Sequence, residues 1–152
     1  MRHRRKAREF VLTVLYQYEV GMGDAVSECF KKHLFYYPLK ENTEAFASLL
    51  CQCIEEHWDF LNEKIKHYAK GWKLERILIL DRNILRIALC EMFFMEDIPY
   101  KVSINEAIEI AKLYCDNKSR IFINGILDKV YKKELNEKQR FDNNSQKKFK
   151  ST

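Results

Sequence analysis

The chain has 152 residues, a mass of 18.3 kDa and a net charge of +5. A chain of this length forms one domain, or one domain of two small subdomains, and buries about 70% of its unfolded surface without needing disulfides. Its 4 glycines and 2 prolines are too few for the closely spaced turns of an all-β sandwich or barrel. No apolar run is long enough for a transmembrane helix. The composition therefore predicts an all-α fold.

The start of the chain is basic, and no apolar segment follows it, which argues against a secretory signal. Transit peptides are rich in serine, whereas the first serine here is Ser27. The five cysteines are an odd number and lie inside apolar helical patterns, at Cys29, Cys51, Cys53, Cys90 and Cys115. We interpret them mostly as small buried hydrophobic residues in a reducing compartment, and we expect a cytoplasmic protein.

Charge is distributed unevenly along the chain. Residues 2–9 carry a net charge of +4, residues 132–152 also carry +4, and the segment between them carries −3. A positive arm on a nearly neutral body is typical of nucleic-acid binding. A solubilising terminus would have the same composition, and charge alone does not separate the two.

Apolar periodicity predicts three helices in the first half of the chain. The first runs from about Arg5 to Val20, and the second from an N-cap at Asp24 to about Tyr36, ahead of Pro38. The third is a single long helix from Thr43 to about Tyr68, capped by Thr43 or Asn42. Gly71 can end or hinge it and is the predicted boundary between two subdomains.

The second half is predicted to contain a short helix over Trp72–Ile79 and three longer ones. Asp81 would cap a helix to about Met95, and Ser103 with Glu106 would form a capping box for a helix to about Tyr114. The last helix would run from about Ser119 to Leu135. Asn124-Gly125 is typical of a β-hairpin turn, but the flanking residues do not alternate between apolar and polar, so we keep it inside this helix. A close backbone approach to another helix or to a ligand would explain a glycine at this position. Residues 136–152 are polar and basic, and we expect a disordered tail.

Few residues in this pattern suggest catalysis. The glycines are isolated and form no phosphate-binding loop. Cys53 and His57 share a helical face, but a metal site would need further ligands, so a core pair is the favoured interpretation. Glu106 and Glu109 have no partner that would support acid–base chemistry. Arg82 and Arg86 indicate a buried ion pair or an anion site, and the ion pair is the favoured interpretation. We therefore predict no enzyme activity, no metal and no cofactor.

Three stretches together resemble the NusB family of bacterial transcription antitermination factors. The first is Arg4-Arg-Lys-Ala-Arg-Glu9 followed by Leu15-Tyr16. The second joins residues 81–91, DRNILRIALCE, to residues 98–112, IPYKVSINEAIEIAK. The third is residues 119–128, SRIFINGILD. The order and spacing cover roughly residues 4–133, and the last two stretches are the most specific.

The resemblance implies about seven helices in two small bundles, at about 5–70 and 72–135, within one domain over residues 1–135. It implies an RNA-binding factor that takes the boxA element of ribosomal RNA leader transcripts together with the ribosomal protein NusE. This pair joins RNA polymerase and other Nus factors and suppresses premature termination. The resemblance implies no catalysis.

The resemblance also implies that the basic N-terminus and the start of the last helix lie together and bind the RNA. Cations would hold phosphates, aromatic rings would stack on bases, and a helix N-terminus would favour an anion. The residues of this chain that the resemblance assigns to RNA binding are Arg4, Arg5, Lys6, Arg8, Tyr16, Lys118, Ser119, Arg120, Phe122 and Asn124. From periodicity alone, Phe122 and Tyr16 fit the core equally well or better.

A basic ribosomal protein would be steered by acidic residues of the C-terminal bundle. The candidate interface residues are Glu75, Asp81, Tyr100 and Glu106. Two other functions remain open at this point. One is a helical protein–protein scaffold without specific RNA binding, and the other is an enzyme that uses an accessible Cys53 beside His57.

Overall fold

The structure is a computed structural model that describes residues 2–136. These residues form seven α-helices and no strand, so the all-α prediction is confirmed. The helices are α1 (Arg2–Glu19), α2 (Val26–Tyr36), α3 (Glu41–Glu56), α4 (Trp58–Tyr68), α5 (Ile79–Phe94), α6 (Tyr100–Tyr114) and α7 (Asn117–Val130). A 3-10 turn covers Leu74–Arg76 and a π-helical turn covers Tyr131–Leu135. The predicted tail, apart from Asn136, lies outside the described residues.

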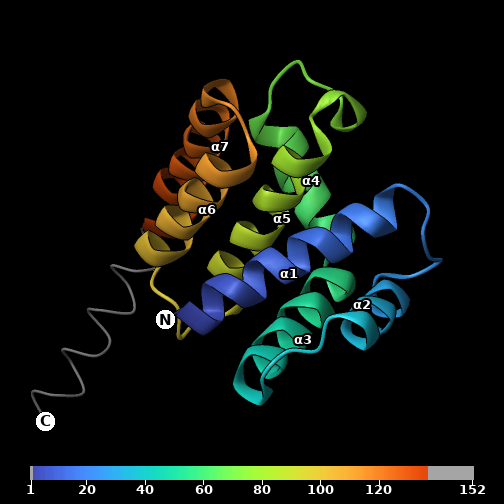
Figure 1. Cartoon of the computed structure of the whole chain (residues 1–152). Coiled ribbons are helices and arrows are strands. Elements are labelled where there is room, and N and C mark those ends of the chain that lie inside the picture. Colours follow the sequence, from blue (N-terminus) through green and yellow to red (C-terminus); the bar gives the residue numbers. More distant parts are fainter. Residues whose placement is uncertain (1, 137–152) are drawn as a thin grey trace, which may run out of the picture.

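Helix α5 is the centre of the fold. It packs against α1, α3, α4, α6 and α7, while α2 packs against α1 and α3 (Figure 1). The two predicted bundles thus share α5, and their separation at Gly71 stays a prediction. Gly71 does adopt a left-handed φ of 84° after α4 ends, a conformation that glycine adopts at no steric cost.

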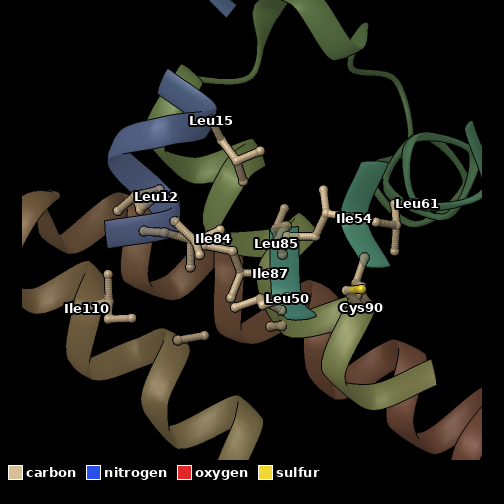
Figure 2. Close-up of a cluster of buried hydrophobic side chains, with 14 of the residues drawn as sticks. Leu12, Leu15, Leu50, Ile54, Leu61, Ile84, Leu85, Ile87, Cys90 and Ile110 are labelled. Carbon is tan, nitrogen blue, oxygen red and sulfur yellow. The ribbon is translucent and has the colours of Figure 1, made fainter. Parts of the chain in front are cut away.

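The apolar stripes of the helices meet in one core around α5. Leu12 and Leu15 of α1 face Ile84 and Leu85 of α5, and Leu50 of α3 closes the cluster from another side (Figure 2). Each of these residues is at most 3% exposed. Burying a side chain of this size contributes roughly 1.5–3 kcal/mol, so this cluster stabilises the packing of α1 and α3 on α5.

The predicted long helix over residues 43–68 is wrong in one respect, because it breaks at His57. His57 has φ −115° and ψ 23°, and it separates α3 from α4. Two ring contacts lie at this break. The His57 ring lies 3.7 Å from that of Phe94, and Trp58 packs its ring edge-to-face against Tyr18. Periodicity missed the break because the apolar stripe continues across it.

The predicted caps are mostly wrong, since the helices begin earlier than the capping residues suggest. Helix α1 begins at Arg2, α3 at Glu41, α5 at Ile79 and α6 at Tyr100. This places Asn42, Thr43, Asp81, Ser103 and Glu106 inside first or second turns. Ala25, not Asp24, occupies the N-cap of α2. Most of these polar side chains make tertiary contacts instead, which local sequence spacing cannot reveal.

Other boundaries shift by smaller amounts. The expected helix over Trp72–Ile79 is only the 3-10 turn, and the last helix starts at Asn117 with Asp116 as its N-cap. Gly125 does lie within α7, but a Cβ built on it would meet no atom within 4 Å. The prediction of close approach to another helix is therefore wrong, and a ligand remains as the possible reason for glycine.

Helices α1 and α5 are joined at one end by a buried charge cluster. Glu19 accepts hydrogen bonds from Arg82 at 2.9 Å and from Arg86 at 2.8 Å, and Asn83 donates to the same carboxylate. The Arg86 side chain is only 1% exposed, and its guanidinium lies 4.0 Å from the Trp58 ring centroid. The predicted buried ion pair is therefore confirmed, with Glu19 as the partner.

Substituting Glu19→Ala leaves two buried guanidinium groups without their carboxylate. We expect the free energy of unfolding to fall by about 3–5 kcal/mol, as for other buried pairs that lose one partner. Urea unfolding followed by circular dichroism measures this change. The control Glu109→Ala removes an exposed pair with Lys112 and should cost at most about 0.5 kcal/mol. A loss for Glu19→Ala no larger than the control's would contradict the assignment.

Candidate nucleic-acid interface

The basic residues at the start of the chain lie on the first turns of α1, and three of their arginines are paired. Arg4 contacts Asp97 at 3.3 Å, ahead of α6. Arg5 donates two hydrogen bonds, of 2.8 and 2.9 Å, to Glu106 on α6. The Lys6 side chain is exposed. The arm is therefore a helical edge held against α6, and its cations are partly neutralised by carboxylates.

Arg8 differs from its neighbours because it is buried. Its side chain is 3% exposed and makes a two-pronged contact with Glu91 of α5, at 2.7 and 2.8 Å. Ser103 donates a further hydrogen bond to Glu91, and the Phe46 ring centroid lies 5.4 Å from the guanidinium. A phosphate could reach Arg8 only by displacing these groups. This geometry supports a structural role, and contact of Arg8 with RNA stays a prediction.

Glu106 holds Arg5 rather than capping its own helix. The hydrogen bond from Arg5 lowers the pKa of Glu106, while its partial burial works in the opposite direction. The Glu106 side chain is 18% exposed, and Arg8 lies 3.7 Å away. Glu106 was predicted as a partner-interface residue. In that role it would either break its contact with Arg5 or bind Arg5 and the partner at the same time.

The start of α7 is fixed by two hydrogen bonds. Asp116 accepts from the Ser119 backbone N–H at 2.8 Å, and this contact lowers the pKa of Asp116. The Ser119 hydroxyl donates to Asp81 of α5 at 2.9 Å, with both residues buried. Burial raises the pKa of Asp81. Ser119 and Asp81 thus face each other inside the protein, where they orient α7 against α5.

The remaining predicted residues differ in how accessible they are. Lys118 and Asn124 are exposed on α7, and Tyr16 of α1 is 43% exposed. Arg120 is half-buried and donates to Asn117. Phe122 is partly buried and packs against the core. These five residues keep accessible surface for a ligand.

Two of the predicted partner residues also keep accessible surface. Glu75 is exposed in the 3-10 turn. Tyr100 is half-buried, and its ring centroid lies 5.7 Å from that of Tyr131. Asp81 and Glu106 are less accessible, because both are engaged inside the chain as described above.

The two predicted RNA-binding segments meet α6 at different points, and their joint contact with RNA stays a prediction. The N-terminal arm pairs with Asp97 and Glu106, at the beginning and in the first half of α6, and Figure 1 shows the N-terminus beside this end. The segment from Lys118 to Asn124 follows the other end of α6. A helix of this length spans about 20 Å. A ligand that contacts both segments must therefore extend along the protein.

Three apolar residues beside the turn between α6 and α7 are exposed, and none of them was among the predicted site residues. Leu113 is 65% exposed, Tyr114 is 51% exposed and Ile121 is 67% exposed. Leu113 and Ile121 lie off the core-facing stripes of their helices, whereas Tyr114 continues the stripe of Ala107 and Ala111 at the end of α6. For Leu113 and Ile121 that position was the available signal, because large apolar residues off the buried stripe often mark contact surfaces.

The structure also places the residues of the alternative enzyme hypothesis. Cys53 and His57 line one open groove. A hydrogen bond with the Cys90 thiol lowers the pKa of Cys53, while the pKa of Cys90 is raised by the same contact and by burial. Within residues 2–136, no three His, Cys, Asp or Glu side chains are grouped as metal ligands would be. No helix in this part of the chain is both long and apolar enough to cross a membrane.

The fold defines a class of protein, an all-helical protein in which α1, α6 and α7 carry the candidate contact residues. Comparison with known proteins narrows this class. The sequence model of the NusB family matches residues 5–132. The chain therefore belongs to the NusB family of transcription antitermination proteins.

Similar proteins agree in sequence and in structure. The transcription antitermination protein NusB of Thermodesulfovibrio yellowstonii is 38% identical over 87% of this chain and 93% of its own length. NusB of Bacillus thuringiensis is 43% identical over 84% of this chain and 95% of its own. A solved structure of NusB from T. maritima superimposes with a TM-score of 0.78 at 35% identity, covering 86% of this chain and 91% of that one.

A further structural relative is a complex. It is a crystal structure of the antitermination factors NusB and NusE with double-stranded RNA. It matches with a TM-score of 0.78 at 25% identity, over 87% of this chain and 98% of that chain.

The contact between Arg5 and Glu106 predicts a pH dependence. Because the pKa of Glu106 is lowered in the folded protein, its contribution to stability is present above the unfolded pKa of about 4.3 and is lost as pH falls through the folded value. In Glu106→Gln, we expect stability to fall less steeply between about pH 5 and 3. Urea unfolding at a series of pH values measures this slope. Arg5→Ala should reduce it as well, and an unchanged slope in both variants would refute the assignment.

Proposed function

We propose that this chain binds boxA-type single-stranded RNA from ribosomal RNA leader transcripts together with the ribosomal protein NusE. In this proposal, the pair acts in the cytoplasm, with RNA polymerase and other Nus factors, to suppress premature termination. The observation that carries it is membership of the NusB family over residues 5–132, together with the likeness to the solved NusB–NusE complex with RNA. Binding alone performs this function, and it needs neither a catalytic residue nor a cofactor.

The RNA surface that we propose consists of two cationic ends, with Phe122 near one of them and Tyr16 further along α1 from the other. Arg4, Arg5 and Lys6 form one end, and Lys118 with Arg120 forms the other. Lysine and arginine side chains bind phosphates, and their binding releases condensed counterions. For Arg4 and Arg5, phosphate would compete with the carboxylates of Asp97 and Glu106.

Base contacts would come from exposed rings and from α7. The accessible faces of Tyr16 and Phe122 suit stacking on unpaired bases. Asn124 offers a donor and an acceptor to a base edge. Gly125, one residue further, leaves backbone exposed where a side chain would keep a nucleotide at a distance. This accounts for a glycine within a helix, where it costs about 1 kcal/mol relative to alanine.

Arg8 and Ser119 serve the proposed site by positioning it. Arg8 fixes α1 against α5 through Glu91, and Ser119 fixes the start of α7 through Asp81. The NusE contact that we propose uses the exposed Glu75 ahead of α5, and the accessible sides of Tyr100 and Glu106 on α6. Asp81 would contribute indirectly, by fixing the start of α7 through Ser119. Acidic side chains here would attract a basic ribosomal protein.

The direct test is a fluorescence-anisotropy titration with boxA RNA and with a scrambled RNA of the same length, each with and without NusE. Tighter binding to boxA that is strengthened by NusE supports the proposal. Equal, salt-sensitive binding to both RNAs under every condition refutes it. That result would favour the scaffold alternative, in which the basic residues provide only general attraction.

Removing cations should lower the salt dependence of binding. Each phosphate contact on single-stranded RNA contributes a slope of about −0.7 in a plot of log K against log salt. In the double variant Lys6→Ala with Lys118→Ala, we expect the slope to become about 1.4 less negative. Anisotropy titrations between low and moderate salt measure it. Lys31→Ala, an exposed lysine on α2, is the matched control, and an equal effect of this control would contradict the proposed surface.

Replacing an exposed ring should weaken binding without unfolding the protein. Tyr16→Ala is expected to reduce the affinity for boxA RNA by about 1–3 kcal/mol, because a stacked base loses its partner. The matched control is Phe35→Ala, since Phe35 is 80% exposed on α2, away from the proposed surface. Thermal unfolding should change little in either variant. Normal affinity in Tyr16→Ala would exclude this ring from the RNA site.

A further inference from the structure

An open groove with a negative edge lies where α3, α4 and the end of α5 meet. It consists of two hollows, with volumes of about 620 and 350 Å³, that share Glu56, His57 and Phe94. Its apolar floor is accessible, with Leu49 55% exposed, Phe60 39% exposed and Phe94 37% exposed. None of the RNA-binding residues proposed above lines this groove.

The edge of the groove carries five carboxylates, from Glu55, Glu56, Asp59, Glu96 and Asp97. Among the described residues that line it, none is lysine or arginine. One of the five, Asp97, is already shared with Arg4. Exposed rings surrounded by acids fit an apolar or aromatic side chain that is flanked by cations. This combination defines the chemistry of the occupant.

The chain itself contains such a segment after the described residues. Positions 147–150 read Lys-Lys-Phe-Lys, within a stretch of five basic and two acidic residues over 137–152. We propose that this segment binds the groove of its own chain, with Phe149 on the floor beside Phe94 and the three lysines against the carboxylates. The acid-edged apolar groove and the basic, phenylalanine-bearing segment are complementary in both charge and polarity.

The end of the described chain lies beside the groove. Glu134, two residues before Asn136, contacts Lys64 and Tyr68 of α4. The Lys64 ammonium lies 5.3 Å from the Phe60 ring centroid, and Phe60 lies 5.2 Å from Phe94. Lys64 lies over the ring of Phe60 rather than against an edge carboxylate, and its charge is balanced by Glu134.

The length of chain is sufficient. The stretch between Asn136 and Phe149 reaches on the order of 40 Å when fully extended. A short tether gives an effective concentration of roughly millimolar. A contact with a dissociation constant near 1 mM would therefore be occupied about half of the time. Docking would also place the lysines against carboxylates and so withdraw them from general contact with RNA.

Methionine methyl resonances test this contact in the full chain. The protein has four methionines, and Met95 lines the groove, whereas Met22 is exposed in the loop after α1 and Met92 is buried in α5. With 13C-methyl methionine, Phe149→Ala should shift the Met95 resonance through loss of the ring current and leave Met22 in place. Glu56→Gln with Glu96→Gln should shift Met95 in the same direction. Salt near 1 M, where the Debye length is about 3 Å, should reproduce this shift in the unaltered protein.

The matched control is Phe141→Ala, because Phe141 belongs to the same stretch but has Asp142 beside it. It should leave Met95 unchanged. An unmoved Met95 resonance in Phe149→Ala, or an equal shift in Phe141→Ala, overturns the proposal. A Met95 shift that grows with protein concentration also overturns it, since the occupant would then be a second copy. RNA is absent from this experiment, so failure here is independent of the proposed RNA function.

Discussion

The arrangement of this molecule depends on two buried sets of charges that join α1 to α5. Near the start of α1, Arg8 meets Glu91 in the second half of α5. At the end of α1, Glu19 meets Arg82 and Arg86 in the first half of α5. The signs are exchanged between the two ends, so the helices satisfy both sets only when antiparallel and in one register. Buried ion pairs contribute little net stability compared with apolar packing, but an unpaired buried charge is costly, which penalises every other alignment.

This fixed register determines which basic residues remain for a partner. With Arg8 committed to Glu91, α1 presents Arg4, Arg5 and Lys6 at the start of α6, and two of the three already have carboxylate partners. At the other end, the bond from Ser119 to Asp81 sets the direction in which α7 begins. The same contacts that stabilise the fold thus determine the positions and the net charge of the proposed RNA surface.

Sequence predicts well what depends on local periodicity. The buried apolar stripes of α1, α5, α6 and α7 follow from the spacing of apolar residues. Two cations on an apolar helix also indicate that Arg82 and Arg86 pair with a buried acid. Sequence predicts poorly what depends on distant partners. Ser103 and Glu106 have the spacing of a capping box, yet Ser103 bonds to Glu91 and Glu106 bonds to Arg5. The break at His57 likewise coincides with contacts to distant helices, Phe94 of α5 and Tyr18 of α1, and nothing in the neighbouring sequence marks it.

The separation of the two cationic ends gives the proposed joint binding of RNA and NusE a physical reason. An RNA that reaches from the arm to the start of α7 along α6 would pass Glu106 and Glu109, which are partly exposed. Phosphates passing these carboxylates would be repelled, and the repulsion is strongest at low salt. A basic protein bound beside them would neutralise this charge and could release Arg5 for the RNA. On this argument the two ligands bind cooperatively, with each favouring the other by the same factor, because the coupling between two binding sites is reciprocal.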